Sequence, residues 1–168
     1  MNYLGINCSV DKGFGKVIVV ILNSDNEVMR YVFKSPSVFS FKENSAEILN
    51  WHRDNIISLI SQYNIEGISI KKTESSPYAR LKNSDIFKLY LEGVLLSLAG
   101  SIGKPNRHFY KSNIKAILND PVIFDLDIDT ICANFNVVNC FDDIPNVEVE
   151  STKDTLLAVL SLKRKIVI

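Results

Sequence analysis

Alternating and clustered hydrophobic residues at the start of the chain predict three short strands. Residues 2–8 ("NYLGINC"), 16–22 ("KVIVVIL") and 28–34 ("VMRYVFK") are rich in β-branched and aromatic residues. The segments between them, "SVDKGFG" and "NSDN", consist mainly of turn-forming residues, and "GFGK" lies where a hairpin turn is needed. The pattern therefore predicts an antiparallel meander.

The hydrophobic period then changes to that of helices separated by short strands. Asn44 and Glu47 have the spacing of a capping box, and the helix that follows to about Tyr63 places His52 on its apolar face. The later predicted elements are a strand at 67–70, a helix at 84–99, a strand at 106–110, a short helix at 112–119 and a last helix from near Ser151. Crossover connections of this kind make the later strands parallel. We therefore expect an α/β fold with a mixed five-stranded sheet, three antiparallel strands and then two parallel ones, with flanking helices.

Length and composition favour one domain. A chain of 168 residues with 46% hydrophobic residues can bury one sizeable core. No apolar run approaches the ~18 residues of a membrane span, and the first residues do not have the pattern of a signal peptide. Three cysteines without metal-ligand spacing favour reduced thiols, and strand alternation places Cys8 in the core beside Leu4 and Ile6. We expect a cytoplasmic protein without membrane contact.

Charge is distributed unevenly although its formal sum is zero. Residues 71–115 contain nine Lys or Arg against three acids, whereas residues 116–152 contain eight acids and no Lys or Arg. The basic segment is compatible with phosphate binding. The alternative is that the acidic segment folds over the basic one and neutralises it.

Several segments together resemble the ribonuclease H-like superfamily, particularly the bacterial Holliday-junction resolvases and small uncharacterised bacterial relatives. The segments are "YLGINCS", "GISIKK", "IFKLYLEGVLLSLAG" followed by "HFYKSNIKAIL", and "STKDTLLAVLSL". The resemblance implies a single ribonuclease H-like domain over residues 1–168, with a poorly matched acidic insertion at about 119–150.

The resemblance also implies where a catalytic metal site would lie. Active members hold two divalent ions with carboxylates on the first strand, at the end of the fourth strand and on the last helix. These positions fall on Asn7, on Lys71 or Lys72, and on Asp154. Only Asp154 is an acid, so we expect a degenerate site that holds no metal and needs no cofactor. We expect Asn7 and Asp154 to lie close together, with Lys71 or Lys72 in a salt bridge to Asp154.

Two alternatives to this interpretation stay open. If Ser151 is the N-cap of the last helix, Asp154 is its third residue and serves only as part of a capping box. In the other alternative, Asp11 and Glu74 join Asp154 to hold Mg²⁺ or Mn²⁺, and the protein is an active metal-dependent nuclease.

The function favoured by these residues is binding without catalysis, to nucleic acid or to a protein partner, including a second copy of the chain. The candidate nucleic-acid contacts are the cations of the basic segment: Lys72, Arg80, Lys82, Lys104, Arg107 and Lys111. Tyr78 and Phe109 are candidate stacking groups among them.

Overall fold

A mixed five-stranded sheet forms the centre of the molecule. The structure is a computed structural model, and it describes residues 1–11, 14–37, 43–74, 82–138, 141 and 143–166. The strand order is β3-β2-β1-β4-β5. The pairs β3–β2 and β2–β1 are antiparallel, and the pairs β1–β4 and β4–β5 are parallel. The strands are β1 (Asn2–Asp11), β2 (Phe14–Asn23), β3 (Val28–Lys34), β4 (Ile65–Lys71) and β5 (Asn106–Phe109).

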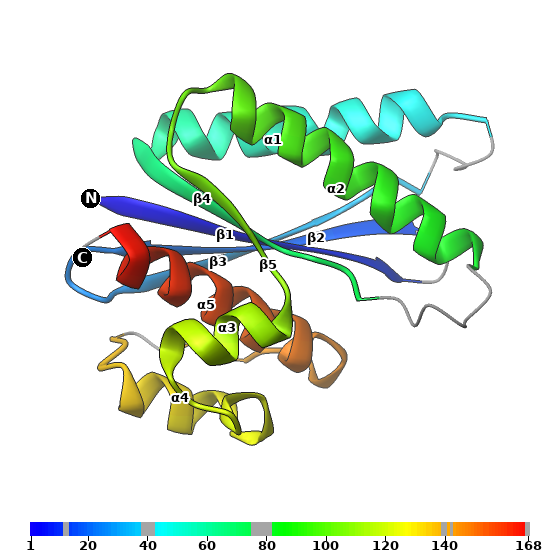
Figure 1. Ribbon diagram of the computed structural model, residues 1–168. Coiled ribbons are helices and arrows are strands. Elements are labelled where there is room, and N and C mark those ends of the chain that lie inside the picture. The colour runs from blue at the N-terminus through cyan, green and yellow to red at the C-terminus, as the bar shows by residue number, and fades with distance from the viewer. Residues whose placement is uncertain (12–13, 38–42, 75–81, 139–140, 142, 167–168) are drawn as a thin grey trace.

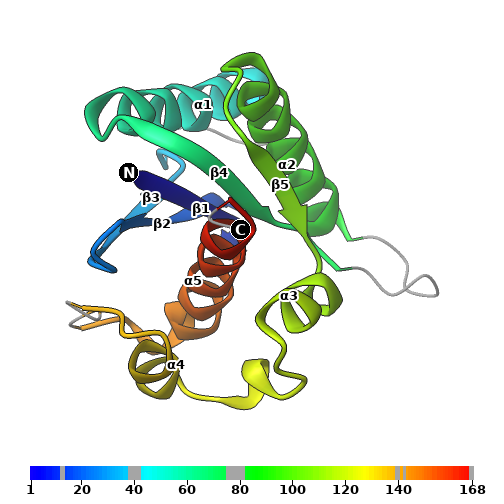
Figure 2. The same cartoon turned by 60° about the vertical axis from the view of Figure 1, so that its left-hand side comes forward.

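Helices cover both faces of this sheet. The helices are α1 (Ser45–Gln62), α2 (Asn83–Ser101), α3 (Lys111–Leu118), α4 (Ile128–Asn134) and α5 (Asn146–Ile166), with a short 3₁₀ helix η1 (Ile123–Asp125). Figures 1 and 2 show α1 and α2 on one face and α5, α3 and α4 on the other. Each face has its own apolar core, and strand alternation divides β1 between them: Leu4, Ile6 and Cys8 face α1 and α2, whereas Tyr3 packs with α5.

The predicted fold class, a mixed sheet of three antiparallel strands and then two parallel ones, is confirmed. The first strand is longer than predicted and reaches Asp11, because its pairing with β2 continues to the Asp11–Phe14 pair. His52 is buried on the apolar face of α1, as predicted. Asn44 is the N-cap of α1, but its side chain makes no capping hydrogen bond, so the predicted capping box is not formed.

The start of the last helix was wrongly predicted. α5 begins at Asn146, directly after Pro145, and not at Ser151. Proline just outside the first turn is a frequent start signal, because a helix leaves its first N–H groups unpaired in any case. Asp154 consequently lies in the third turn of α5, and the interpretation of Asp154 as a capping residue is wrong.

α5 crosses β1 at very short range. A Cβ atom added at Gly5 would lie 2.7 Å from the Thr155 carbonyl oxygen and 3.0 Å from the Val159 Cβ. Only glycine permits this approach, since real Cβ atoms do not come so close to backbone. The crossing brings the part of α5 that carries Asp154 next to Asn7 in the middle of β1.

The acidic segment 119–150 packs against α5. Ile123, Ile131 and Cys132 join the apolar core on the α5 side of the sheet. Lys153 of α5 donates to the Phe124 and Leu126 carbonyl oxygens at 2.9 and 3.3 Å. The segment is therefore part of the α5 layer.

Two further expectations concern the cysteines and the membrane. Cys8 is free and buried, as predicted, whereas Cys132 is disulfide-bonded, so the prediction of reduced thiols is wrong for Cys132. None of the helices in the described ranges is long and apolar enough to cross a membrane.

Candidate functional site

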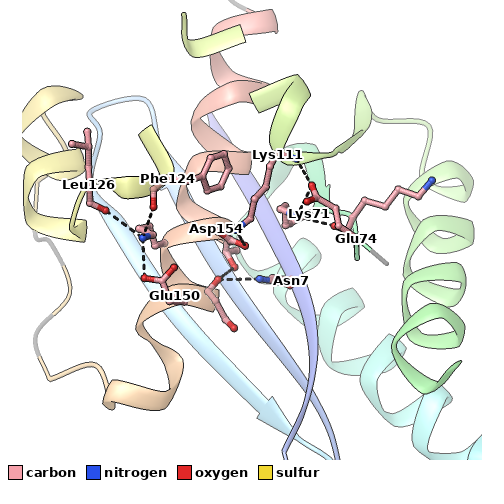
Figure 3. Close-up of polar contacts among 12 residues, drawn as sticks. Asn7, Lys71, Glu74, Lys111, Phe124, Leu126, Glu150 and Asp154 are labelled. Carbon is pink, nitrogen blue, oxygen red and sulfur yellow. Dashed lines mark hydrogen bonds and ion pairs between the residues drawn. The ribbon is translucent and has the colours of Figure 1, made fainter. Parts of the chain in front are cut away.

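The middle of β1 and the end of β4 meet the third turn of α5 at one polar position. Asn7 of β1 pairs with Lys71, the last residue of β4, in the parallel register. The Asn7 side-chain amide donates to the Ser151 carbonyl oxygen of α5 at 3.2 Å. Figure 3 shows Asn7, Lys71 and Asp154 around this position. The structure therefore brings together Asn7, Lys71 and Asp154, three of the positions that the resemblance implies for a metal site.

Asp154 is mostly buried at this site. Its side chain is 15% exposed, and its Oδ2 lies 3.8 Å from the Lys111 Nζ. Its Oδ1 is buried and has no hydrogen-bond partner among the described residues. Burial raises the pKa of the Asp154 carboxyl, and the nearby charges of Lys111 and Lys71 oppose this shift. The carboxylate is thus held in a poorly solvated position by one long ion pair.

Lys71 ends β4 and is, with Lys72, one of the two residues on which the resemblance places the acid of the fourth strand. Its side chain is only 6% exposed. The Nζ donates to the Lys72 carbonyl oxygen at 2.8 Å and lies 3.5 Å from Glu74 Oε1. The predicted salt bridge from Lys71 or Lys72 to Asp154 is wrong, because Lys111 at the start of α3 makes that ion pair instead.

Glu74 connects β4 to α3. Its Oε1 accepts a hydrogen bond of 2.5 Å from the backbone N–H of Lys111, the first residue of α3. The same oxygen faces Lys71, and the side chain is 41% exposed. The Glu74 carboxylate therefore lies between an ammonium group and a helix N-terminus, both of which favour negative charge.

Hydrogen bonds to α2 hold the segment after β4 in place. Glu92 of α2 is buried and accepts hydrogen bonds from the Thr73 backbone N–H, at 2.8 Å, and from the Thr73 hydroxyl. This contact holds the residue next to Glu74 against the α2 layer. No local pattern marks this contact, since nineteen residues separate the partners.

A polar cavity of about 320 Å³ surrounds these groups. Four lysines but only two carboxylates line it, so its charge balance is positive. Its lining residues are Asn7, Cys8, Ser9, Lys71, Lys72, Thr73, Glu74, Lys88, Lys111, Ser151 and Asp154. Lys88 and Ser9 were missed in the sequence, where nothing distinguishes them from other surface residues. Cys8 is no nucleophile candidate, because burial and then the charge of Glu92 raise the pKa of its thiol.

The residues of this site do not fit the two divalent ions that the fold implies. Mg²⁺ and Mn²⁺ require several anionic oxygens in a near-octahedral arrangement. Asn7 offers at most one neutral amide oxygen, Lys71 is a cation, and Asp154 is the one carboxylate at the three marked positions. Within the described residues, no three His, Cys, Asp or Glu side chains come together as a metal site.

The candidate nucleic-acid contacts are distributed over several places. Lys72 and Lys111 line the cavity, and the Lys72 Nζ also lies 4.6 Å from the centre of the Tyr110 ring. Arg107 lies in β5 and lines a separate cavity with Lys165. The remaining residues are placed as follows: Lys82 is the N-cap of α2, Lys104 precedes β5, Phe109 is buried, and Tyr78 and Arg80 lie outside the described residues.

A second charged cluster, which was not predicted, lies between α5 and the strands β2 and β3. The buried carboxylate of Glu148 in α5 forms ion pairs with Arg30, with Lys16 at 3.4 Å and with Lys34 at 3.6 Å. Among the causes that act on Glu148, burial raises its pKa, but the hydrogen bond from Arg30 and the charge of Lys16 outweigh it and lower the pKa overall. The cluster joins β2 and β3 to the first turn of α5.

The sheet topology identifies the fold of this protein. A sheet in the order β3-β2-β1-β4-β5, antiparallel and then parallel, with helices on both faces is the ribonuclease H-like fold of the Holliday-junction resolvases. No protein-family model and no curated protein matches the sequence. The similarity is therefore found in the structure.

Several similar solved structures are resolvases. RuvC of T. thermophilus in complex with Holliday junction substrate has a TM-score of 0.70, 12% identity, and coverage of 99% of this chain and 94% of that chain. A second structure of Thermus thermophilus RuvC has a TM-score of 0.65, 12% identity and coverage of 99% and 95%. The yeast mitochondrial Holliday junction resolvase Ydc2 has a TM-score of 0.55, 12% identity and coverage of 96% and 77%. At this identity the comparisons show the fold.

Proposed function

We propose that this protein is a resolvase-fold domain that binds nucleic acid and does not cleave it by a two-metal mechanism. The observation that carries the proposal is the set of groups where β1, β4 and α5 meet. A neutral amide, an ammonium group and one carboxylate occupy that position, in Asn7, Lys71 and Asp154. Such a set lacks the anionic oxygens that divalent ions require, and the other lysines of the cavity favour an anion.

The positive charge of the cavity supports nucleic acid as the ligand. Phosphate contacts by Lys and Arg supply most of the sequence-independent affinity of nucleic-acid-binding proteins. Lys72, Lys88 and Lys111 line the cavity at the end of the sheet where β4 stops. In the similar RuvC complex the ligand is a Holliday junction, so branched DNA is the substrate class that we propose for this chain.

The acidic segment does not neutralise this surface in the described parts of the chain. The acids of 119–150 that form ion pairs there are Glu148, with Lys16, Arg30 and Lys34, and Glu150, with Lys153. The cations of 71–115 that form ion pairs use Glu74, Asp85 and Asp154. The basic segment therefore keeps its positive balance. Binding to a protein partner or to a second copy of the chain stays a prediction.

An active nuclease built from Asp11, Glu74 and Asp154 is the less favoured function. Asp11 ends β1 four residues after Asn7, which places its backbone about 13 Å further along the strand. Glu74 is held by Lys71 and by the N-terminus of α3. Bringing both carboxylates to Asp154 would require the breakage of these contacts and a change at the end of β1.

The proposal is tested by fluorescence anisotropy with a labelled four-way DNA junction at low salt in EDTA. We expect binding without divalent ions, with log K falling linearly against log salt. Lys72→Gln should reduce that slope by about 0.9 for one lost phosphate contact. Arg53→Gln, which removes a cation from α1 on the opposite layer, should leave the slope unchanged. Absence of binding to the junction, to duplex and to single strands at micromolar protein would contradict the proposal and favour a protein partner.

A further inference from the structure

The Glu74 carboxylate occupies a position built to hold an anion. One side is the backbone N–H of Lys111 at the start of α3, 2.5 Å from Glu74 Oε1. The other side is the Lys71 ammonium group, 3.5 Å from the same oxygen. Helix N-termini bind anions through unpaired N–H groups and the positive end of the helix dipole. The chain thus places its own anion where a phosphate oxygen would be bound.

The groups that hold this anion are positioned independently of Glu74. The Lys71 side chain is almost fully buried, and its Nζ donates to the Lys72 carbonyl oxygen at 2.8 Å. α3 is anchored through Ile114 and Leu118, which lie in the apolar core. Lys71 and the start of α3 would therefore keep their places if the Glu74 side chain moved away.

Glu74 can leave this position when another anion takes its place. Its side chain is 41% exposed and can turn into solvent, whereas Lys71 is only 6% exposed and needs a negative charge beside it. A phosphodiester group carries the same single negative charge as the carboxylate, so the exchange keeps the charge balance with Lys71. A phosphate would also lie beside the other lysines of the cavity, Lys72, Lys88 and Lys111.

We propose that Lys71 and the N-terminus of α3 form a phosphate-binding site, that Glu74 is its internal occupant, and that a backbone phosphate of nucleic acid replaces Glu74 on binding. The proposal rests on the proposed function for the identity of the ligand. It assigns to Glu74 the role of an intramolecular competitor. An intramolecular group competes at an effective concentration of about millimolar or higher, so its removal strengthens binding of an external anion.

The variant Glu74→Gln tests this role. Glutamine keeps the shape of the side chain and can still accept from the Lys111 N–H, but it loses the attraction to Lys71. Glu66→Gln is the matched control, because Glu66 lies near the other end of β4 and the change removes the same charge. We expect Glu74→Gln to bind the four-way junction about threefold or more tightly than Glu66→Gln at low salt in EDTA. Inorganic phosphate should shift the amide resonance of Lys111 at lower concentration in Glu74→Gln than in wild type.

The possible results separate this proposal from the proposed function. Equal or weaker junction binding by Glu74→Gln than by Glu66→Gln, or a Lys111 resonance that does not respond to phosphate, would overturn the assignment of this site while leaving nucleic-acid binding intact. If neither variant nor the wild type binds any nucleic acid, the proposed function fails; a phosphate response at Lys111 in Glu74→Gln would then still support an anion site.

Discussion

Replacement of Gly5 by alanine should destabilise the protein by pushing α5 away from β1. The new Cβ would lie 2.7 Å from the Thr155 carbonyl oxygen, 3.0 Å from the Val159 Cβ and 3.2 Å from the Thr155 Cγ2. The nearest atom is helix backbone, so no side-chain rotation removes the clash. Insertion of one methyl group into a well-packed contact costs about 1–3 kcal/mol. We expect Gly5→Ala to lose about 2 kcal/mol of unfolding free energy.

Urea unfolding followed by circular dichroism measures this loss. With a slope of about 2 kcal/mol per molar urea, the midpoint should fall by about 1 M. Gly93→Ala is the matched control, because Gly93 lies inside α2 and an added Cβ meets no atom within 4 Å. It should stabilise the protein by about 0.5–1 kcal/mol, since alanine has the higher helix propensity.

The two variants together give the refuting result. If Gly5→Ala unfolds within about 0.5 kcal/mol of the wild type while Gly93→Ala is stabilised, α5 does not approach β1 as described, because overpacking of a rigid contact exceeds that amount. The position of Asp154 beside Asn7 would then lose its structural basis.

Three further predictions concern titration and metal binding. Burial lowers the pKa of His52 to about 4, so on acidification the unfolded chain binds a proton at this histidine before the folded chain does. The free energy of unfolding, measured in urea, should therefore fall by about 2 kcal/mol between pH 7 and pH 5. An unfolding free energy that does not change over this range would contradict a buried neutral His52. The raised pKa of Asp154 makes its ionisation unfavourable in the folded state, so Asp154→Asn should be more stable than wild type at pH 7, and the difference should vanish below the ordinary pKa of 3.8. The double variant Asn7→Asp, Lys71→Glu should bind Mn²⁺ in calorimetry where the wild type does not, since all three marked positions then carry carboxylates. No heat from the double variant would show that the marked positions do not form a metal site.

Much of the fold could be predicted because local patterns decide it. Strand alternation correctly placed Cys8 with Leu4 and Ile6, and the β-branched runs with turn-forming connections correctly gave the meander. The order of the later elements then limited the topology, since crossover connections make β4 and β5 parallel. The start of α5 was wrongly predicted, because Ser151 and Asp154 have the spacing of a helix N-terminus although the helix begins directly after Pro145.

The contacts of the site could be predicted only in part. The register of β1 and β4 brings Asn7 and Lys71 together, and this follows from the fold. The partners of Glu74 and Asp154 depend on where α3 begins relative to β4, since Lys111 supplies its backbone N–H to one and its ammonium group to the other. Residues 37 and 43 positions apart carry no local signal of such pairing.

The central claim is that the residues where β1, β4 and α5 meet bind a phosphate but hold no catalytic metal. Cleavage of a labelled four-way DNA junction by saturating protein, followed on denaturing gels with Mg²⁺, with Mn²⁺ and with EDTA, tests it most directly. We expect the junction to stay intact in all three conditions. Metal-dependent cleavage that disappears in Asp154→Asn would contradict it.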